Sequence, residues 1–411
     1  MLKRFIYYMF ERRHYWRHVS FSEVAELYAS RTMRIFALSM VVVFVGIYLY
    51  KNGYSLSFIM LYFSAYFVLR AALAVPFSFL IARFGPKHMI LASNLLYVPA
   101  LISLALLHEF GIWALVGTAV FQALSVTLYD IAYLVDFSKV KHDDHAGKEI
   151  GYMHLLEHVA KAISPVVGGF IAYWVSPEAT LVFAATVFAL SAIPLFFTPE
   201  PVRTHQKITY YGLPWRKVSR TVVSQAAVGV DTIASGLLWS MFVAIAVFGT
   251  ATDVVYAQLG VLSSISVIAG VVAARIFGAV VDRRRGNELL TTGVVAKALT
   301  HLGRAAVATP FGAVMINVFN EITSTAYLLP YTKGMFSQAD DLPGYRIVYM
   351  TLMSVSGALG AALLCASVAL LAGMLDETVS LQAGFVLSAI LTLAILAHGF
   401  RRYLKPRFFF Q

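Results

Sequence analysis

The stretch GAVVDRRRGN, residues 278–287, closes a long apolar run with an aspartate and three arginines. A second apolar run ends in SFLIARFGPK, residues 78–87, which lies 200 positions earlier. Both stretches run from a small residue through apolar residues to an arginine and a glycine. The same basic turn thus closes two apolar segments half a chain length apart, which predicts that the chain consists of two equivalent halves.

The composition predicts an all-α membrane protein. The chain has 411 residues, of which 59% are hydrophobic and 13% are charged, whereas soluble domains have about 25% charged residues. The apolar residues form repeated continuous runs of about 20 residues or more, the length that crosses a bilayer as a helix. Continuous runs do not fit the alternating pattern of a membrane β-barrel. The single cysteine, Cys365, excludes an internal disulfide and a Cys-rich metal site.

The apolar runs and the turn signals between them predict twelve transmembrane helices. We expect them at residues 22–50, 56–83, 88–108, 111–137, 149–175, 178–198, 219–249, 254–282, 288–308, 311–338, 345–374 and 378–402. No cleavable signal peptide is expected, because more than 30 residues precede the first long apolar run.

The basic residues of the predicted loops lie on one side of the membrane. Counted over alternate loops and both termini, 24 Lys and Arg residues fall on one side, and only Lys51 falls on the other. Cytoplasmic loops carry the excess of Lys and Arg in membrane proteins. Both termini are therefore predicted to be cytoplasmic in a multi-pass protein of the cell membrane. The net charge of +11 then needs no nucleic-acid partner.

The longest interruption, residues 199–218, divides the chain into two predicted six-helix bundles. It holds three prolines and, with His205, five basic residues, as expected of a cytoplasmic linker. The aromatic and basic residues at the N-terminus suit an amphipathic helix on an anionic leaflet. The predicted units are an arm at 1–20, an N-terminal bundle at 21–198, the linker at 199–218, a C-terminal bundle at 219–403 and a tail at 404–411.

Twelve spans in two halves with a basic turn after the second and eighth helices resemble the major facilitator superfamily. The family signature at this turn is Gly-x-x-x-Asp-Arg-x-Gly followed by basic residues, and Gly278, Asp282 and Arg283 follow it. The first half keeps Arg83 but has Ala82 at the aspartate position. The resemblance implies that Arg83, Asp282 and Arg283 form a gate that holds helix ends together on the cytoplasmic side.

Apart from the Lys and Arg residues already counted for the loops, helix ends and termini, seven basic residues lie within the predicted helices, where a charge near the bilayer centre is costly. From their depth, Arg31 and Arg34 are expected to reach the inner headgroups, and Arg304 is expected near the outer surface. Arg70, Lys161 and Lys297 lie near mid-membrane. Lys297 is on the ninth helix, which the resemblance makes peripheral, so two placements stay open for it: a side chain that reaches the headgroups, or one that faces the bundle with His301.

Polar side chains on four predicted helices suggest a shared cavity. Glu157 and Lys161 stand four residues apart and are expected to pair, and Asn317, Asn320 and Glu321 share one strip. The candidate substrate-binding residues are Arg70, Gln122, Tyr129, Asp130, Lys161, Asn317 and Asn320. The candidate proton-coupling residues are Asp231, Glu321 and Glu157, since burial favours the protonated form of a carboxyl group.

The leading hypothesis is a secondary active transporter, which both the resemblance and the polar residues within the helices favour. It would move a small polar or amphipathic solute by alternating access, coupled to protons, as a monomer in the lipid bilayer and without a cofactor or metal. A lipid or lysolipid flippase and a non-transporting receptor or scaffold stay open as alternatives. An enzyme is not expected, because the chain has no G-x-x-x-x-G-K-[ST], H-E-x-x-H or G-x-S-x-G motif.

Overall fold

The fold was determined as a computed structural model that describes residues 21–140, 146–196, 208–282 and 285–400. Within these ranges, the side chains of residues 21–25, 136–140, 146–155, 279 and 281–282 are not described. The predicted arm at 1–20 and tail at 404–411 lie outside the described residues. So do residue Arg283 and the side chain of Asp282, which leaves most of the predicted gate untested.

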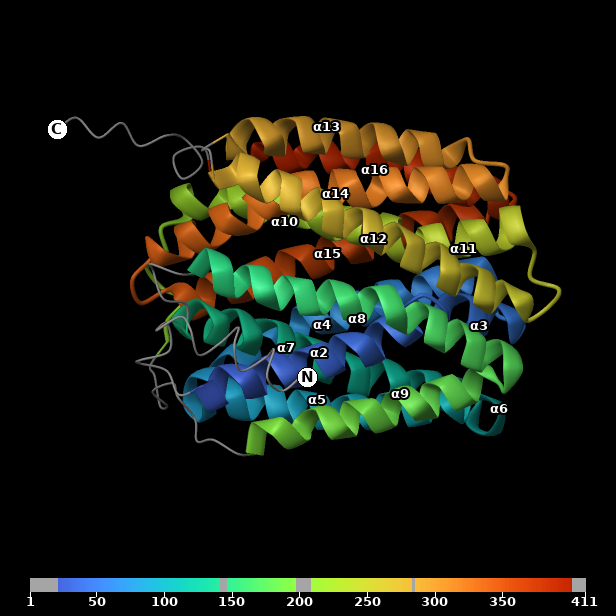
Figure 1. The fold of residues 1–411 in the computed structure, drawn as a ribbon, viewed down its shortest axis with the longest axis horizontal. Helices are drawn as coiled ribbons and strands as arrows, with labels where there is room; N and C mark the ends of the chain where they lie inside the picture. The colour runs from blue at the N-terminus through green and yellow to red at the C-terminus, as the bar shows by residue number, and fades with distance from the viewer. Residues whose placement is uncertain (1–20, 141–145, 197–207, 283–284, 401–411) are drawn as a thin grey trace, which may run out of the picture.

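Long helices lying side by side make up the molecule (Figure 1). The N-terminal half consists of α2 (Phe21–Val42), α3 (Val45–Lys51), α4 (Leu56–Phe84), α5 (Pro86–Ala105), α6 (Leu107–Phe110), α7 (Ile112–Val140), α8 (Ala146–Trp174), α9 (Pro177–Ala192) and the 3₁₀ turn η1 (Ile193–Phe196). The C-terminal half consists of α10 (Trp215–Ile233), the π-helical turn η2 (Ala234–Leu238), α11 (Trp239–Phe242), the π-helical turn η3 (Val243–Phe248), α12 (Val254–Asp282), α13 (Gly286–Ala305), α14 (Pro310–Asp340), α15 (Arg346–Ala372), α16 (Glu377–Thr392) and the 3₁₀ turn η4 (Leu393–Ala397).

Local sequence explains where several helices begin. Hydroxyl side chains cap three of them: Ser55 accepts from the backbone of Phe58, Ser176 from Ala179 and Thr309 from Gly312. A proline at the first helical position starts α5, α9 and α14, where no backbone N–H is needed. Gly85 has φ of 90° and turns the chain from α4 into α5.

Several predicted helices are interrupted, among them the third, in which α5 ends at Ala105 and α6 begins at Leu107. The first one is two helices, since α2 ends at Val42 and α3 begins at Val45. The seventh begins at Trp215 rather than at 219, so the end of the predicted linker is helical. This helix also contains the two π-helical turns, a feature that the hydrophobic pattern does not signal.

Nine helical segments among the described residues are long and apolar enough to cross a membrane, so the chain is a multi-pass membrane protein. The long helices α8, α13 and α14 fall outside this set. Both α13 and α14 carry ionisable residues within their length, among them Lys297, Arg304 and Glu321.

The two ends of the molecule are packed differently. We call the end at which α4 passes into α5 the basic end and the end at which α3 passes into α4 the opposite end, which is on the right in Figure 1. The largest buried apolar cluster combines residues of both halves, such as Phe44 and Ile47 with Trp239 and Phe385. The other two clusters are each dominated by one half. The halves thus share one core, and it lies toward the opposite end.

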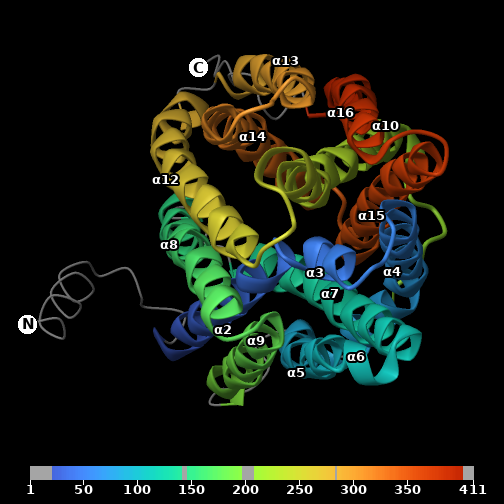
Figure 2. The same cartoon turned by 90° about the vertical axis from the view of Figure 1, so that its right-hand side faces the viewer.

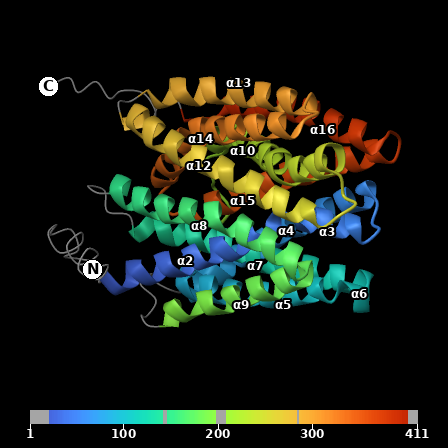
Figure 3. The same ribbon diagram turned by 45° about the vertical axis from the view of Figure 1, so that its right-hand side comes forward.

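Two helix pairs form the seam between the halves. Viewed from one end, α4 lies beside α15, and α8 lies beside α12 (Figure 2). Figure 3 shows the two halves on either side of this seam, with α13, α14 and α16 in the upper group and α2, α5 and α9 in the lower one. Ser57 donates to the carbonyl of Ala369 at 2.8 Å, and Ser64 donates to that of Ala362 at 3.0 Å. These bonds join α4 to α15 in the half of the bundle nearer the opposite end.

Candidate functional site

Asp231 lies at the point where the regular part of α10 ends. The π-helical turn η2 follows at Ala234, and π-helical turns are frequent at functional sites because they shift one residue out of the regular hydrogen-bonding pattern. The carbonyl of Ala234 accepts a hydrogen bond from Arg304 at 3.1 Å. Asp231 is only 3% exposed, and a charge at such a position needs partners.

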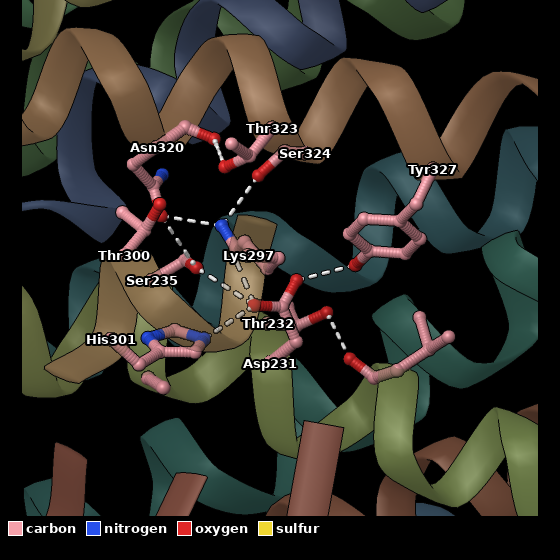
Figure 4. Close-up of polar contacts among 12 residues, drawn as sticks. Asp231, Thr232, Ser235, Lys297, Thr300, His301, Asn320, Thr323, Ser324 and Tyr327 are labelled. Carbon is pink, nitrogen blue, oxygen red and sulfur yellow. Dashed lines mark hydrogen bonds and ion pairs between the residues drawn. The ribbon is translucent and has the colours of Figure 1, made fainter. Parts of the chain in front are cut away.

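Four side chains from three helical segments surround the carboxylate of Asp231 (Figure 4). Oδ1 lies 2.7 Å from Nε2 of His301, 3.4 Å from Nζ of Lys297 and 3.3 Å from the hydroxyl of Ser235. Oδ2 accepts from the hydroxyl of Tyr327. We call these five residues the Asp231 cluster. Lys297 and His301 stand four residues apart on α13, so both point from one face toward α10.

Lys297 is fully buried and faces the bundle. Of the two placements expected from the sequence, the structure therefore has the second. Besides Asp231, its ammonium group contacts Asn320 and Ser324 on α14, the latter at 2.6 Å. With three neighbours, this buried cation is fully solvated by protein groups, which makes its position on α13 tolerable.

The cluster meets more accessible residues along α10. Ser235 is partly exposed and also contacts Asn320 at 3.2 Å. Thr232 and Gly236 are exposed, and no heavy atom lies within 4 Å of the position that a Cβ at Gly236 would take. Ser235 thus joins the buried carboxylate to the accessible face of α10.

Arg304 is fully buried, although it stands in the last turn of α13. Its guanidinium contacts the side chain of Asn317 at 3.1 Å and lies 4.5 Å from the ring centre of Trp239. Asn317 in turn donates to Ser266 at 2.6 Å. The side chain is long enough to extend from the end of α13 into the bundle, where it meets the carbonyl of Ala234 at the start of the π-helical turn.

Glu321 lies apart from this network, although it neighbours Asn320 in the sequence. It is partly buried and faces α12, where Oε2 lies 3.5 Å from the position that a Cβ on Gly270 would take. Among the described residues, no hydrogen bond or ion pair engages its carboxylate. Asn317 and Asn320 therefore serve the buried network, whereas Glu321 lies on a different face of α14.

The N-terminal half also buries arginines. Arg34 is 2% exposed and donates to Asn94 at 2.7 Å and to Ser125 at 3.3 Å. Its guanidinium also lies over the ring of Tyr129 at 3.8 Å. The expectation that Arg34 reaches the headgroups is wrong, because the hydroxyl and amide groups of neighbouring helices solvate it within the bundle.

Arg31 is also turned inward, and the expectation that it reaches the headgroups is wrong as well. Its guanidinium pairs with Glu157 of α8, contacts the hydroxyl of Tyr129 at 3.2 Å and lies 3.5 Å from the ring centre of Tyr133. Glu157 therefore pairs with α2 and not with Lys161. Lys161 itself is partly buried, and no hydrogen bond or ion pair joins it to any residue whose side chain the structure describes.

Arg70 and Asp130 form an ion pair between α4 and α7 with an N–O distance of 2.6 Å. The side chain of Asp130 is 42% exposed although it lies within a long helix. Gln122, one of the other residues expected to bind substrate, donates to the hydroxyl of Tyr97 at 2.9 Å. Arg83, the described member of the predicted gate, is exposed and lies beside the ring of Phe84.

The described contacts distribute the predicted residues over both halves and do not gather them in one place. Asp231 is bonded within the C-terminal half, while Arg70 is bonded within the N-terminal half. The described contacts do not join Arg70, Lys161, Asp231 and Glu321 to one another, and that they line one chamber stays a prediction. The sequence does signal some of the residues in the buried network around Asp231, since Lys297, His301 and Arg304 follow one helical face. It gives no such signal for Tyr327.

The chain is similar to known membrane transporters in sequence profile and in fold. The sequence profile of the Major Facilitator Superfamily matches residues 27–365. No curated protein matches the chain. A solved POT family transporter in complex with 5-aminolevulinic acid has a TM-score of 0.71 at 13% identity, with 93% of this chain and 97% of that chain covered.

A second solved structure, a POT family transporter with a thioalcohol-conjugated peptide, has a TM-score of 0.69 at 13% identity over the same shares of both chains. At this identity the similarity shows the fold alone. The profile match covers more than half of the chain and shows the family. On this evidence the chain belongs to the major facilitator superfamily.

Proposed function

We propose that the protein is a proton-coupled secondary transporter that moves a small polar or amphipathic solute across the cell membrane by alternating access. Membership of the family and the similarity to solved transporters support secondary transport. We further propose that α8, α13 and α14 cross the membrane together with the nine apolar segments, which makes twelve spans in two six-helix halves. Their charged residues do not oppose this, since Lys297 and Arg304 are buried against polar partners.

The Asp231 cluster is the observation that carries the proposal of proton coupling. Asp231 lies about 16 Å along α10 from Arg220, at about 1.5 Å per residue, which is close to mid-bilayer. Intramembrane carboxylates that meet lysine and histidine are typical of proton pathways. Each of the three ionisable partners, Lys297, His301 and Tyr327, comes from a different helix than Asp231.

Protonation of Asp231 would change the packing of three helices at once. A neutral Asp231 no longer attracts the ammonium group of Lys297, which then keeps only the neutral groups of Asn320 and Ser324. A buried cation without its counter-ion is unfavourable by several kcal/mol, on the order of 3–5. The protonated state therefore favours a different arrangement of α10, α13 and α14, as coupling requires.

The packing at the two ends supports alternating access between two states. The shared apolar core and the bonds between α4 and α15 close the opposite end. We propose that this state opens toward the basic end, which the charge distribution makes cytoplasmic. The accessible polar residues Arg70, Asp130 and Lys161 are then the proposed substrate contacts, while Asn317 and Asn320 hold the buried cations in place.

The experiment uses protein reconstituted in proteoliposomes. A screen of thermal stabilisation over sugars, amino acids, peptides, nucleosides, drugs and lipids first selects a solute, and solutes of the size held by the compared transporters come first. Proton uptake upon addition of this solute is then followed with an enclosed pH dye. We expect Asp231→Asn to abolish solute-driven proton uptake and Glu321→Gln to reduce it.

The matched control is Asp253→Asn, which removes a carboxylate at the opposite end that pairs with Lys51. This variant should retain proton uptake within about twofold of the original rate, because surface ion pairs contribute little. Solute-driven proton uptake that persists unchanged in both Asp231→Asn and Glu321→Gln would contradict the proposed coupling.

A further inference from the structure

Three of the four side chains that contact the carboxylate of Asp231 are closed off from water. Lys297, His301 and Tyr327 are each fully buried, whereas Ser235 is partly exposed. The side chain of Asp231 itself is only 4% exposed. A proton that reaches Asp231 in this state must therefore pass through one of these contacts.

The three buried contacts do not offer a path for a proton. Nδ1 of His301 is buried and has no hydrogen-bond partner among the described residues. The hydroxyl of Tyr327 donates to Asp231 and makes no second bond to any side chain that the structure describes. Lys297 does contact a partly exposed hydroxyl, that of Ser324, at 2.6 Å. Its ammonium group carries three hydrogens and no lone pair, however, so it cannot accept a proton.

The hydroxyl of Ser235 can both donate and accept. It lies 3.3 Å from Oδ1 of Asp231 and 3.2 Å from Oδ1 of Asn320. Both partners are acceptor oxygens, so the hydroxyl hydrogen points into the cluster, and its lone pairs accept from no residue within the described ranges. A group that donates to the carboxylate and accepts from outside has the two properties that proton transfer requires.

The packing around α10 determines which space Ser235 faces. Asp231 is bonded to α13 and α14. Ser224 donates to the carbonyl of Ile395, just beyond α16, at 3.0 Å, and a Cβ at Gly229 would lie 1.9 Å from the carbonyl oxygen of Gly357 on α15. Figure 2 shows α13 and α16 on the side of α10 that is turned away from the N-terminal half. The side that these neighbours leave uncovered therefore faces the space between the two halves.

Exposed positions lie directly beside Ser235 in this segment. Thr232 and Gly236 are exposed, and no heavy atom lies within 4 Å of the position that a Cβ at Gly236 would take. The hydroxyl of Thr232 is not a second path, because it donates to the backbone carbonyl of Val228 at 2.8 Å. Among the described contacts of Asp231, Ser235 is thus the one that connects the carboxylate to this open face.

We infer that Ser235 is the proton-transfer residue through which Asp231 exchanges protons with the space between the two halves. This inference rests on the proposed function, since it requires that Asp231 binds a proton. A hydronium ion at the open face gives a proton to a lone pair of Oγ of Ser235, while the hydrogen already on Oγ passes to Oδ1 of Asp231. One O–H bond forms at Oγ and one breaks, so that the serine stays neutral, a water molecule remains outside and the carboxylate becomes a carboxyl group.

Alternating access then also controls the proton. Because Ser235 faces the space between the halves, the side of the membrane from which Asp231 exchanges protons is the side to which this space is open. The proton and the solute thus share one route.

The test measures how fast Asp231 takes up a proton. A light flash releases protons from a caged compound around the protein in lipid, and the infrared band of protonated carboxyl groups is followed in time. The component of this band that is lost in Asp231→Asn reports Asp231. Ser235→Thr and Ser235→Val form a matched pair, because the new side chains have the same shape and only threonine keeps the hydroxyl.

We expect the Asp231 component to form at the original rate in Ser235→Thr. In Ser235→Val it should form about 100-fold more slowly, in keeping with the contribution of a positioned proton-transfer group. The final size of the component at low pH should be the same in both variants, since Ser235 determines the path of the proton and not its destination. A purely structural role of Ser235 would change the final size instead.

Thr232→Val is the control for the loss of a hydroxyl on the same face, and it should leave the rate unchanged, since this hydroxyl is bonded within its own helix. Thermal unfolding in detergent verifies that each variant is folded. Ser235→Ala takes the place of Ser235→Val if the latter does not fold, and it should also slow the formation of the component.

An Asp231 component that forms equally fast in Ser235→Val and Ser235→Thr overturns the inference and leaves proton binding by Asp231 intact. Slower formation in Ser324→Ala at an unchanged rate in Ser235→Val also overturns it, because the proton would then pass through Lys297. A band without any component that depends on Asp231 overturns the proposed coupling together with this inference.

Discussion

The two halves bury opposite charges on equivalent helices. Arg31 on α2 and Asp231 on α10 stand 200 positions apart, the same spacing that separates the two basic turns. Arg31 and Arg34 remain charged at any working pH and are held by tyrosine, amide and carboxylate groups. Asp231, in contrast, is surrounded by lysine, histidine and tyrosine, which can all exchange protons. The buried charges of α2 are thus fixed, whereas the buried charge of α10 can change.

The largest expected effect is that of removing Lys297, the cation that stabilises the buried charge of Asp231 in the C-terminal half. Lys297→Ala leaves Asp231 buried without its nearest cation, so we expect the free energy of unfolding to fall by about 3–5 kcal/mol. Chemical unfolding in a mild detergent measures the loss.

The double variant Asp231→Asn with Lys297→Met provides the control, because it removes both charges and keeps the volume of the side chains. It should recover most of the lost stability. A double variant as unstable as Lys297→Ala would show that packing, and not the ion pair, determines the effect.

A smaller effect is expected in the N-terminal half. Arg34→Met removes a cation whose described hydrogen bonds go to the neutral groups of Asn94 and Ser125, so no buried anion is left behind. We expect the free energy of unfolding to fall by about 1–3 kcal/mol, the cost of acceptors without a donor. The same unfolding assay applies, and a loss larger than that of Lys297→Ala would reverse the proposed difference between the halves.

The smallest effect concerns an exposed ion pair that joins the halves. Lys51 pairs with Asp253 at the opposite end, where the aspartate side chain is 55% exposed. Lys51→Ala should reduce the free energy of unfolding by at most about 1 kcal/mol, and less at high salt. A loss of several kcal/mol would mean that this surface contact, and not the shared apolar core, closes the opposite end.

The sequence predicted the elements of the fold well, because hydrophobic length and basic turns mark helices and loops directly. It also identified Asp231, Lys297 and Asn320 as ionisable or polar residues within helices. The depth of a residue along its helix did not predict the direction of the long basic side chains, since those of Arg34 and Arg304 extend inward to the amides of Asn94 and Asn317. Such partners lie on other helices and have no fixed spacing in the sequence.

The pairing of Asp231 with Tyr327 shows the same limit. The two residues are 96 positions apart, and a tyrosine in an apolar helix is most often part of the core. The sequence also gives no signal for the π-helical turn after Asp231, although the carbonyl of its first residue meets Arg304. Pairings of this kind depend on how α10, α13 and α14 pack, which hydrophobic periodicity does not specify.

Infrared difference spectroscopy of the protein in lipid, recorded as the pH is lowered, tests the central claim most directly. The band of protonated carboxyl groups reports which side chain takes up the proton. We predict that a component of this band is lost in Asp231→Asn and is retained in Glu157→Gln, because Glu157 stays ionised beside Arg31. A band that is unchanged in Asp231→Asn and lost in Glu157→Gln would contradict the account, because the proton would then bind in the half with the arginines.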